Sequence, residues 1–590
     1  MNLHREIPLL RLWSPATVLA AVLVAGACDL NVENPNAPDA PRAFRDPSGL
    51  EGLMSGAFRT WVETRGDYFG VMAMTAMADN YTASWNNGAL RFYSSVGQEC
   101  PSRCGWNNSA VADEAAGGPS VETQWYGYYS VLAAANNVLL AIADGVCFDG
   151  DCTADSTVTT RNTAIVKMMQ GMALAGIALA YDQGFIVDER TPPGAPSTLP
   201  FYPRAEVRDS ALRKFEEAWT IAGDTMWSTP EEWMGVGSGT SYTNTQIRQL
   251  IRTMQAELIA LSPRNSAENA AADWATVASY ASQGISSGTP FDWEYYIDVS
   301  GRECGLDCVK TWGNSIGTMR VDTRVAAILT TNHVDPWPVP SGNPCPTVSA
   351  DLRVGDGSYG PTDNYNGYST RAATANAGKD FACSGVAIFA PARGQYHQSN
   401  LQHVRYQRLA YRGENLPGFN GTGQDPFYIV QMNDLLWAEG LLRRPAPDLS
   451  TAADLINNSR VGRGGLSTLT AADGLPALLA ALQYEQEIEF MGQGATPFFN
   501  RRRSGYNAPA AGGRPEYVDG LVVGTPRHMP VPALEMDGLG RATYSFGGPG
   551  TPDMAPAANG GDGISDARRS VWDIWQEYMA LRRTLSTSRN

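Results

Sequence analysis

Apolar residues recur at helical spacing along most of the first half of this 590-residue chain, and this pattern constrains its fold more than any other feature. Within 50–64 an apolar stripe forms one helix face. Similar stripes predict helices over 121–143, 161–181, 206–222, 245–261 and 273–283. Successive helix pairs of roughly 30–40 residues have the size of tetratricopeptide-type repeats, here in degenerate form. The first stripe consists of Leu50, Leu53, Met54, Ala57, Phe58 and Trp61.

The helical pattern stops in the middle of the chain. Residues 289–425 are dense in Gly, Asn, Pro, Tyr and Trp and show little periodicity. Because the segment is too long for one plain loop, we expect a loop-rich subdomain inserted among the helices. Helices are predicted again over 427–443, 450–460 and 471–491, and a short one over about 566–584.

The N-terminus has the pattern of an export signal. Residues 16–27 form an unbroken run of small and apolar residues, shorter than the roughly 20 that span a membrane. The run follows a basic start and ends at Cys28, which predicts cleavage and lipid attachment at Cys28. The alternative is an ordinary signal peptide cleaved nearby, which would leave the protein exported but free.

These patterns divide the chain into five parts. Residues 1–27 are the predicted lipoprotein signal peptide, and 28–45, rich in Asn, Pro and Asp, form a tether. The N-terminal helical-repeat region covers 46–288, the inserted loop-rich subdomain 289–425, and the C-terminal helical region with its tail 426–590. We expect no later stretch to cross a bilayer.

Eight cysteines remain after Cys28, an even number in an exported chain, and this predicts four disulfides. The alternative is metal binding, but zinc motifs favour CxxC pairs, and no His lies beside any of the cysteine pairs. The predicted bridges are Cys100–Cys104, Cys147–Cys152, Cys304–Cys308 and Cys345–Cys383.

The formal charge of −16 argues against nucleic acid as a partner. The one basic run, 501–503, is interpreted as a solvated helix end. The alternating Glu485, Glu487 and Glu489 are predicted not to share a helix face, so they form no acid/base pair.

Metal and cofactor sites find little support in the sequence. His397 and His403 have no ligand partner in register, and the acidic residues near 351–363 lack the spacing of an EF-hand loop. The sequence contains neither a GxSxG elbow nor a phosphate-binding Gly loop with Lys. We therefore expect no cofactor and no metal. The acidic residues in question are Asp351, Asp356 and Asp363.

Two clusters combine aromatic rings with amides and charges, as recognition of sugars requires. The alternative for each aromatic residue is a place in the core. The candidate ligand-binding residues are Asp79, Tyr81, Trp85, Asn86, Asn87 and Arg91 in the first cluster, and Trp293, Tyr295, Tyr296 and Trp312 in the second.

The order of several motifs resembles the SusD/RagB family of outer-membrane lipoproteins. The segments FYIVQMNDLLWAEGLLR (427–443), ADLINNSRVGRGGL (453–466), YEQEIEF (484–490) and GTPRHMPVPALEM (524–536) are similar to the family's C-terminal motifs, and 167–185 to an earlier helix. Residues 493–496 (QGAT) depart from the family's E-G-x-R, so the local packing there is expected to differ.

The resemblance implies a mostly α-helical fold, with four degenerate tetratricopeptide-like units and a variable binding subdomain. It also implies a place at the outer membrane, exposed on the cell surface, as the partner of a SusC-like TonB-dependent transporter. The expected function is capture of an oligosaccharide or similar nutrient, without catalysis. The alternatives are a membrane-tethered glycoside hydrolase, which needs two opposed carboxylates, and a helical-repeat scaffold that binds only protein.

The signal pattern makes lipid anchoring testable. The substitution Cys28→Ala removes the thiol that would carry the lipid, so the variant should accumulate as an uncleaved or free form. Detergent partitioning and electrophoretic mobility measure this change. Unchanged behaviour of the variant in both measurements would rule out the anchor.

Overall fold

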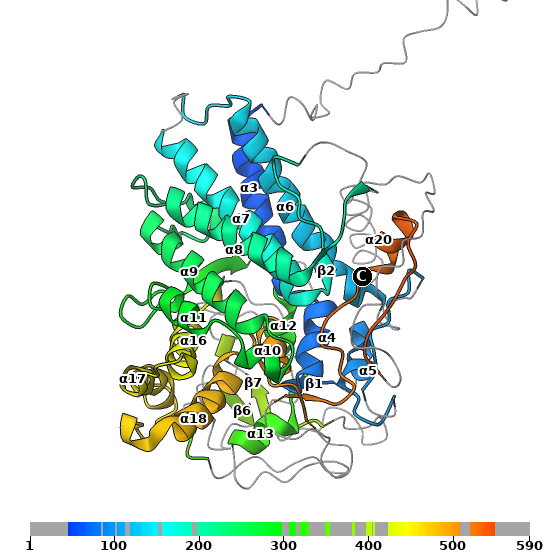
Figure 1. The fold of residues 1–590 in the computed structure, drawn as a ribbon, viewed down its shortest axis with the longest axis vertical. Coiled ribbons are helices and arrows are strands. Elements are labelled where there is room, and N and C mark those ends of the chain that lie inside the picture. The colour runs from blue at the N-terminus through cyan, green and yellow to red at the C-terminus, as the bar shows by residue number, and fades with distance from the viewer. Residues whose placement is uncertain are drawn as a thin grey trace, which may run out of the picture.

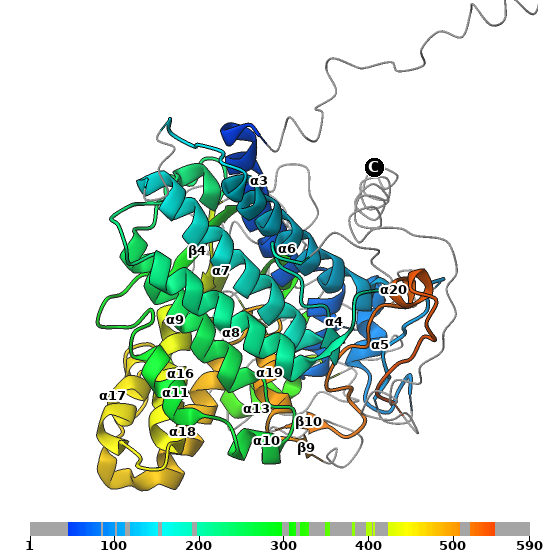
Figure 2. The same cartoon turned by 45° about the horizontal axis from the view of Figure 1, so that its top comes forward.

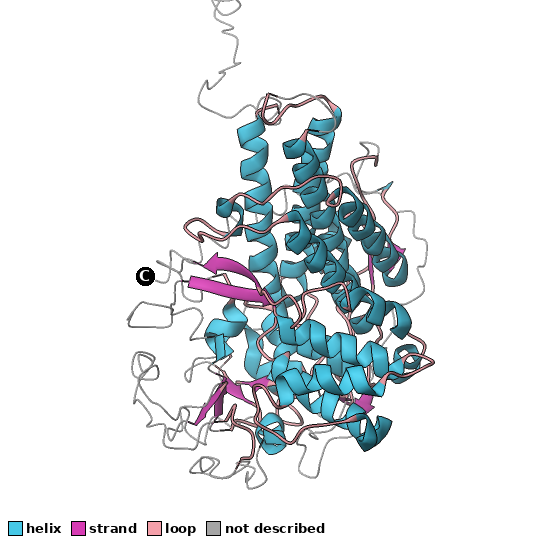
Figure 3. Ribbon diagram, turned by 90° about the vertical axis from the view of Figure 1, so that its left-hand side faces the viewer, coloured by secondary structure: helices cyan, strands magenta, loops and turns pink. Residues whose placement is uncertain are grey.

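The structure is a computed structural model in which helices dominate, so the predicted mostly α fold class is confirmed (Figure 1). The helices pack against one another in chain order, and the strands form short pairs at their side (Figure 3). The structure describes residues 45–83, 86–100, 103–111, 118–150, 156–191, 198–297, 306–313, 319–329, 349–354, 380–383, 397–399, 401–403, 405–406, 423–507 and 520–548. The predicted signal peptide, Cys28 and the predicted helix at 566–584 lie outside these ranges.

The predicted helices of the first half are confirmed, and capping side chains fix the starts of several of them. Ser156 accepts a hydrogen bond from the backbone of Thr159, so that helix begins four residues before the predicted start. Thr243 and Gln246 form a reciprocal capping box. The helices are α3 (Pro47–Arg65), α4 (Gly70–Met77), α5 (Leu90–Ser94), α6 (Glu122–Ala143), α7 (Thr157–Ala180), α8 (Arg204–Ile221), α9 (Asn244–Leu261), α10 (Ser266–Ala270) and α11 (Trp274–Ala281), with 3-10 turns η1 (Asn87–Ala89), η3 (Gly118–Val121) and η5 (Glu231–Met234).

Small residues on α7 let its neighbours approach closely, as the sequence predicts. A Cβ at Gly171 would lie 2.6 Å from the ring of Phe215 in α8, and one at Gly176 2.4 Å from the ring of Tyr128 in α6. Within the part of the chain that the structure describes, α7 alone is long and apolar enough to cross a membrane. Because 89% of its apolar window is buried, α7 is the core helix of this body.

The two ends of the predicted insertion pair with each other. Strand β4 (Trp293–Ile297) runs antiparallel to β8 (Gly423–Tyr428), so 289–425 leaves and re-enters the helical body at one place. The aromatic end of β8 belongs to this ladder, and the helix predicted from 427 therefore begins at Val430. The described elements between β4 and β8 in the sequence are α12 (Cys308–Gly313), β5 (Arg320–Val321), α13 (Thr323–Leu329), β6 (Phe381–Cys383) and β7 (Leu401–His403). Strand β5 pairs with β1 (Tyr81–Thr82) of the N-terminal region. A separate pair joins β2 (Gln183–Gly184) to β3 (Tyr202–Pro203).

The repeat continues beyond the insertion, because α11 packs against α16 and α16 against α17 and α18. Gly492, at φ +79°, ends the α18 segment near the predicted position. The last described segment of the chain, 520–548, lies against the loop at 103–108 (Figure 2). There the indole N–H of Trp106 donates to the carbonyl of His528 (2.9 Å). The elements are α16 (Val430–Arg443), α17 (Leu449–Arg460), η7 (Ala471–Asp473), α18 (Gly474–Glu489), α19 (Thr496–Arg502), β9 (Tyr506–Asn507), β10 (Leu521–Val522) and α20 (Ala533–Gly538).

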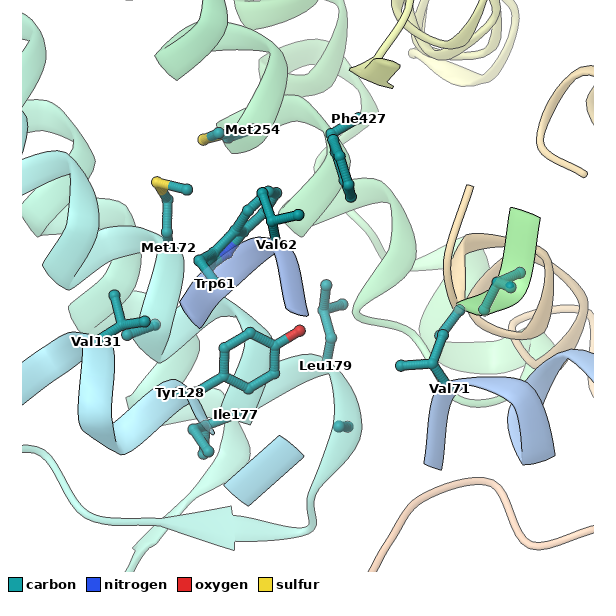
Figure 4. Close-up of a cluster of buried hydrophobic side chains, with 14 of the residues drawn as sticks. Trp61, Val62, Val71, Tyr128, Val131, Met172, Ile177, Leu179, Met254 and Phe427 are labelled. Atoms are coloured by element: carbon teal, nitrogen blue, oxygen red, sulfur yellow. The ribbon is translucent and has the colours of Figure 1, made fainter. Parts of the chain in front are cut away.

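A single large apolar cluster joins the first helices to the returning strand. Figure 4 shows Trp61 of α3, Tyr128 of α6 and Met172 of α7 around one centre, with Phe427 of β8 nearby. These side chains are buried, and the ring centroids of Trp61 and Phe427 lie 6.0 Å apart. The core therefore spans segments that are more than 350 residues apart in the sequence.

The basic run 501–503 is not a solvated helix end, and that prediction is wrong. Arg501, Arg502 and Arg503 are all buried at the end of α19. Arg503 donates hydrogen bonds to both carboxylate oxygens of Glu439 (2.7 and 2.6 Å). Arg502 donates to the backbone carbonyls of Leu179 and Leu261. The run thus ties α19 to α16 and to the C-terminal ends of α7 and α9.

The prediction that the glutamates of α18 share no face is wrong for two of the three. Glu485 and Glu489 are one helical turn apart, and both accept from Nη1 of Arg353 (2.7 and 2.9 Å). Glu487 points elsewhere and pairs with Arg324 (2.7 Å). All three glutamates are buried and paired with arginine, so they act as structural ion pairs.

The disulfide prediction is confirmed for the first pair, because Cys100 and Cys104 are bonded. Cys147 and Cys308 are also disulfide-bonded. Their predicted partners, Cys152 and Cys304, lie outside the described residues. The fourth pair, Cys345–Cys383, stays a prediction, since neither thiol is described.

The Glu439–Arg503 pair gives a stability prediction with a definite pH dependence. Burial alone would raise the pKa of Glu439, but Arg503 and Arg443 lower it to about 2. Its contribution to the free energy of unfolding is therefore present above the ordinary carboxyl pKa of about 4.3 and is lost as the pH falls towards 2. Glu439→Gln should cost about 3–5 kcal/mol at pH 7, because it leaves a buried guanidinium unpaired.

Urea unfolding at pH 7 and pH 3 measures this effect. The double variant Glu439→Leu with Arg503→Met removes both charges and is expected to lose less stability than the single variant. Equal losses for the single and the double variant would show that the charge pair does not control this junction.

Candidate functional site

Among the residues that the structure describes, the enclosed cavity in the core is too small for an oligosaccharide, which favours a site at the surface. The cavity beside Trp61, Arg65, Tyr128, Glu257 and Tyr428 measures about 30 Å³, the share of one water molecule. A wider hollow of about 810 Å³ opens beside the start of α3 and the end of α6. None of the described residues that line it is aromatic, so they offer no ring on which a sugar stacks. Its lining residues are Arg45, Pro47, Asn137, Leu140, Ala141, Asp144, Gly145, Val146 and Cys147.

The best candidate site lies where the loop between α3 and α4 meets α12. Gly66 approaches α12 so closely that a Cβ there would lie 2.6 Å from Cα of Asp307. The backbone N–H of Cys308 donates to the carbonyl of Gly66 (2.8 Å). Only glycine permits this contact, and it fixes the position of the next residues of the loop.

Two aromatic residues from distant segments meet at this contact. The rings of Tyr68 and Trp312 are 4.6 Å apart and almost perpendicular, at 85°. Trp312 is buried, whereas Tyr68 is partly exposed, so Tyr68 is the outer ring of the pair. A Cβ at Gly88 of η1 would lie 3.5 Å from Tyr68, which places the 86–88 turn beside the ring.

A buried layer supports the aromatic pair. The ring of Tyr81 lies under Gly313 at the end of α12, and its hydroxyl is 2.7 Å from Nδ1 of His403. Lys310 of the same helix pairs with Asp307 (2.8 Å) and Asp425 (2.9 Å) in the interior. These contacts hold α12, and with it Trp312, at a fixed position beneath Tyr68.

Polar groups are exposed close to the turn. Asn86 is partly exposed, and Arg91 pairs with Glu99 at 2.9 Å with 39% and 31% of their side chains exposed. Such a surface ion pair contributes little to stability, so ligand hydroxyls can take over its hydrogen bonds at low cost. Sugar recognition needs aromatic, amide and guanidinium groups, and the turn at Gly88 and the residues around it carry all three types.

The structure separates the first predicted cluster into supporting and exposed residues. Asp79 is buried, at φ +55°, and forms an ion pair with buried Arg103. Tyr81 belongs to the supporting layer, whereas Asn86 and Arg91 are partly exposed. Trp85 and the side chain of Asn87 lie outside the described part of the chain, so their ligand roles stay predictions.

The second predicted cluster also separates into buried and partly exposed residues. Trp293 and Tyr295 are buried in the main core, where Trp293 packs against Trp61 with ring centroids 5.4 Å apart. They therefore present no face to a ligand in this structure. Tyr296 is partly exposed and packs against the loop at Gly235, where a Cβ would lie 2.3 Å from its carbonyl oxygen.

The residues weighed as metal ligands have structural partners. Asp351 accepts from Nη2 of Arg353 (2.7 Å) and from the hydroxyl of Tyr484 (2.7 Å). His403 is buried next to Arg405, and burial first and Arg405 second lower its pKa to about 3. No group of three or more potential metal ligands occurs among the described residues. Asp356 and Asp363 lie outside them.

Tyr68 is the functional candidate that sequence reasoning missed. It lies in a short loop outside the two aromatic clusters, and its partner Trp312 lies 244 positions later in the sequence. The signal that was available is the GDYFG segment at 66–70, in which two adjacent aromatics stand between glycines. Aromatic residues in such a turn cannot all enter a helix face, so at least one is expected near the surface.

No protein-family profile and no curated protein matches this sequence. Solved structures do match. A SusD superfamily protein from Parabacteroides distasonis aligns with a TM-score of 0.53 and 12% identity over 84% of this chain and 98% of that one. A SusD superfamily protein from Bacteroides vulgatus gives 0.49 and 11% over 84% and 97%, and surface glycan-binding protein A from Bacteroides uniformis 0.49 and 12% over 83% and 98%.

The likeness to the Parabacteroides protein extends over almost the whole of that protein, so it concerns the complete architecture. At 12% identity it establishes a shared fold. The fold that the sequence resemblance implies is confirmed, and the chain has the SusD fold.

Proposed function

We propose that this protein is a surface-anchored binding protein that captures an oligosaccharide and delivers it to a SusC-like TonB-dependent transporter of the outer membrane. The observation that carries the proposal is the partly exposed Tyr68 ring, which packs on Trp312 next to the turn at Gly88, with Asn86 and Arg91 on the segment around that turn. The SusD fold and the lipoprotein-like signal that ends at Cys28 support it. The solved structures that align with this chain include surface glycan-binding protein A from Bacteroides uniformis.

Binding without catalysis is the form of this proposal that the contacts favour. A glycosidase needs two carboxyl groups about 5–9.5 Å apart on opposite sides of a bond. The described acidic side chains around Tyr68 already have partners: Glu99 pairs with Arg91, Asp307 pairs with Lys310, and Asp67 accepts from the backbone N–H of Gly70. The glutamates of α18, which are the densest acidic group of the C-terminal half, are buried and bound to arginine.

The proposal predicts a loss of affinity when the outer ring is removed. Stacking of one sugar on an aromatic face contributes on the order of 1–2 kcal/mol, so Tyr68→Ala should weaken binding roughly 5- to 30-fold. Calorimetric titration with the oligosaccharide selected by a glycan array measures this loss. The melting temperature of the same variant shows whether the fold is retained.

Two further tyrosines complete the design. Tyr296→Ala tests the rival location in the second cluster, and Tyr202→Ala removes a partly exposed tyrosine of β3 as the matched control. We expect Tyr68→Ala to lower the affinity for the oligosaccharide and Tyr202→Ala to leave it unchanged. A folded Tyr68→Ala variant with full affinity would remove this ring from the site, and a loss confined to Tyr296→Ala would move the site there.

The partner is tested separately. Mild detergent extracts of outer membranes, passed over the affinity-tagged protein, should yield a β-barrel transporter in a ratio near one to one. The acidic body and the tether at 28–45 are consistent with a lid over a barrel. Recovery of the lipoprotein alone would count against delivery to a transporter, while leaving glycan binding intact.

A further inference from the structure

Four arginines surround the place where the C-terminal ends of α7 and α9 meet. Arg264 donates to the carbonyls of Ala178 and Tyr181 at the end of α7, at 3.1 Å for the first of them. Arg502 donates to Leu179 (2.7 Å) and, across to α9, to Leu261 (3.1 Å). The remaining two arginines bind backbone carbonyls just beyond α9: Arg204 that of Ser262, and Arg527 that of Arg264.

The negative charge at this place does not balance the four guanidinium groups. Glu268 pairs with Arg204 (2.6 Å), and Asp182 is the other carboxylate that faces Arg264. Each helix C-terminus adds roughly half a negative charge. Four positive charges against two carboxylates and two helix ends leave about one positive charge in excess.

Buried donors at this place also lack acceptors. Arg264 is 3% exposed, and its Nε and Nη1 have no partner among the described residues; the same holds for Nε of fully buried Arg502. His528 is 8% exposed, packs edge-on against Phe546 (4.3 Å between ring centroids), and has no partner at either ring nitrogen. Burial and the four arginines, Arg264 first among them, lower the pKa of His528 well below its usual value. The ring is therefore neutral and still carries one N–H.

Unmade hydrogen bonds at buried charged donors are expensive, so such groups normally have a partner. We propose that Arg264, Arg502 and His528 bind a monovalent inorganic anion of the size of chloride between the ends of α7 and α9. One such anion supplies the missing negative charge and accepts hydrogen bonds from the unpartnered N–H groups. The site is independent of the Tyr68 surface and of the proposed sugar binding.

Thermal unfolding in two salts tests the proposal. In sodium chloride at about 0.15 M, compared with sodium gluconate at equal ionic strength, an anion bound only by the folded chain should raise the melting temperature by roughly 1–3 °C. In His528→Phe, which keeps a ring against Phe546 but lacks the N–H, the chloride-dependent rise should fall by about half or more. In Arg252→Gln, which removes a buried arginine of α9 that pairs with Glu216 of α8, the full rise should persist.

Crystals of the unmodified protein in sodium bromide give a measurement that does not depend on any variant. An anomalous peak within hydrogen-bond distance of Arg264 and His528 is the expected result. Water alone at that position, bromide only at surface arginines, or equal melting temperatures in the two salts would each overturn the proposal.

Discussion

Three consecutive arginines, Arg501, Arg502 and Arg503, hold the helical layers of this molecule in register. Each reaches a different part of the fold: Glu487 of α18, the carbonyl ends of α7 and α9, and Glu439 of α16. A buried guanidinium that loses its partner costs several kcal/mol, so displacement of any of these helices is strongly opposed. One short helix therefore fixes the positions of four long ones.

The same constraint reaches the candidate site through α3. Arg65, the last residue of α3, donates to Glu257 of α9 (2.9 Å) and lies over the ring of Tyr428 (4.7 Å). Thr496, at the start of the helix that carries the three arginines, also binds Glu257 (3.2 Å). The loop that presents Tyr68 thus begins at a residue tied to the charged junction, and its other side is closed by the Gly66–α12 contact.

The helices of the repeat region could be predicted because their signal is local. A stripe such as Leu50, Met54, Phe58 and Trp61 determines both the helix and its buried face, whatever the rest of the chain does. The start of α16 could not be placed in the same way, since pairing with β4 decides that Phe427 and Tyr428 are extended. Their partner strand lies about 130 residues earlier in the sequence.

The burial of the charged side chains of α18 and α19 could not be predicted for the same reason. Arg501–Arg503 looked like a solvated helix end, because in sequence a run of arginines carries no information on the carboxylates and carbonyls that will surround it. Glu485 and Glu489 lie one turn apart, which helical geometry alone gives, yet their partner Arg353 comes from the predicted insertion. Long-range electrostatic complementarity is a property of the fold, and it cannot be deduced from local composition.

The candidate site shows the limit of composition most clearly. Aromatic density points to the segments near 80 and 312, but density does not distinguish a ring that stacks on a ligand from one that supports such a ring. Exposure makes the distinction: Trp312 and Tyr81 are buried, and Tyr68 stands above them. A ring that binds a sugar must be exposed and yet rigid, because each freely rotating side chain loses entropy on binding. In this fold the buried aromatic layer and the Lys310 ion pairs supply that rigidity. The outer residues can therefore vary with the ligand without changes to the fold beneath them.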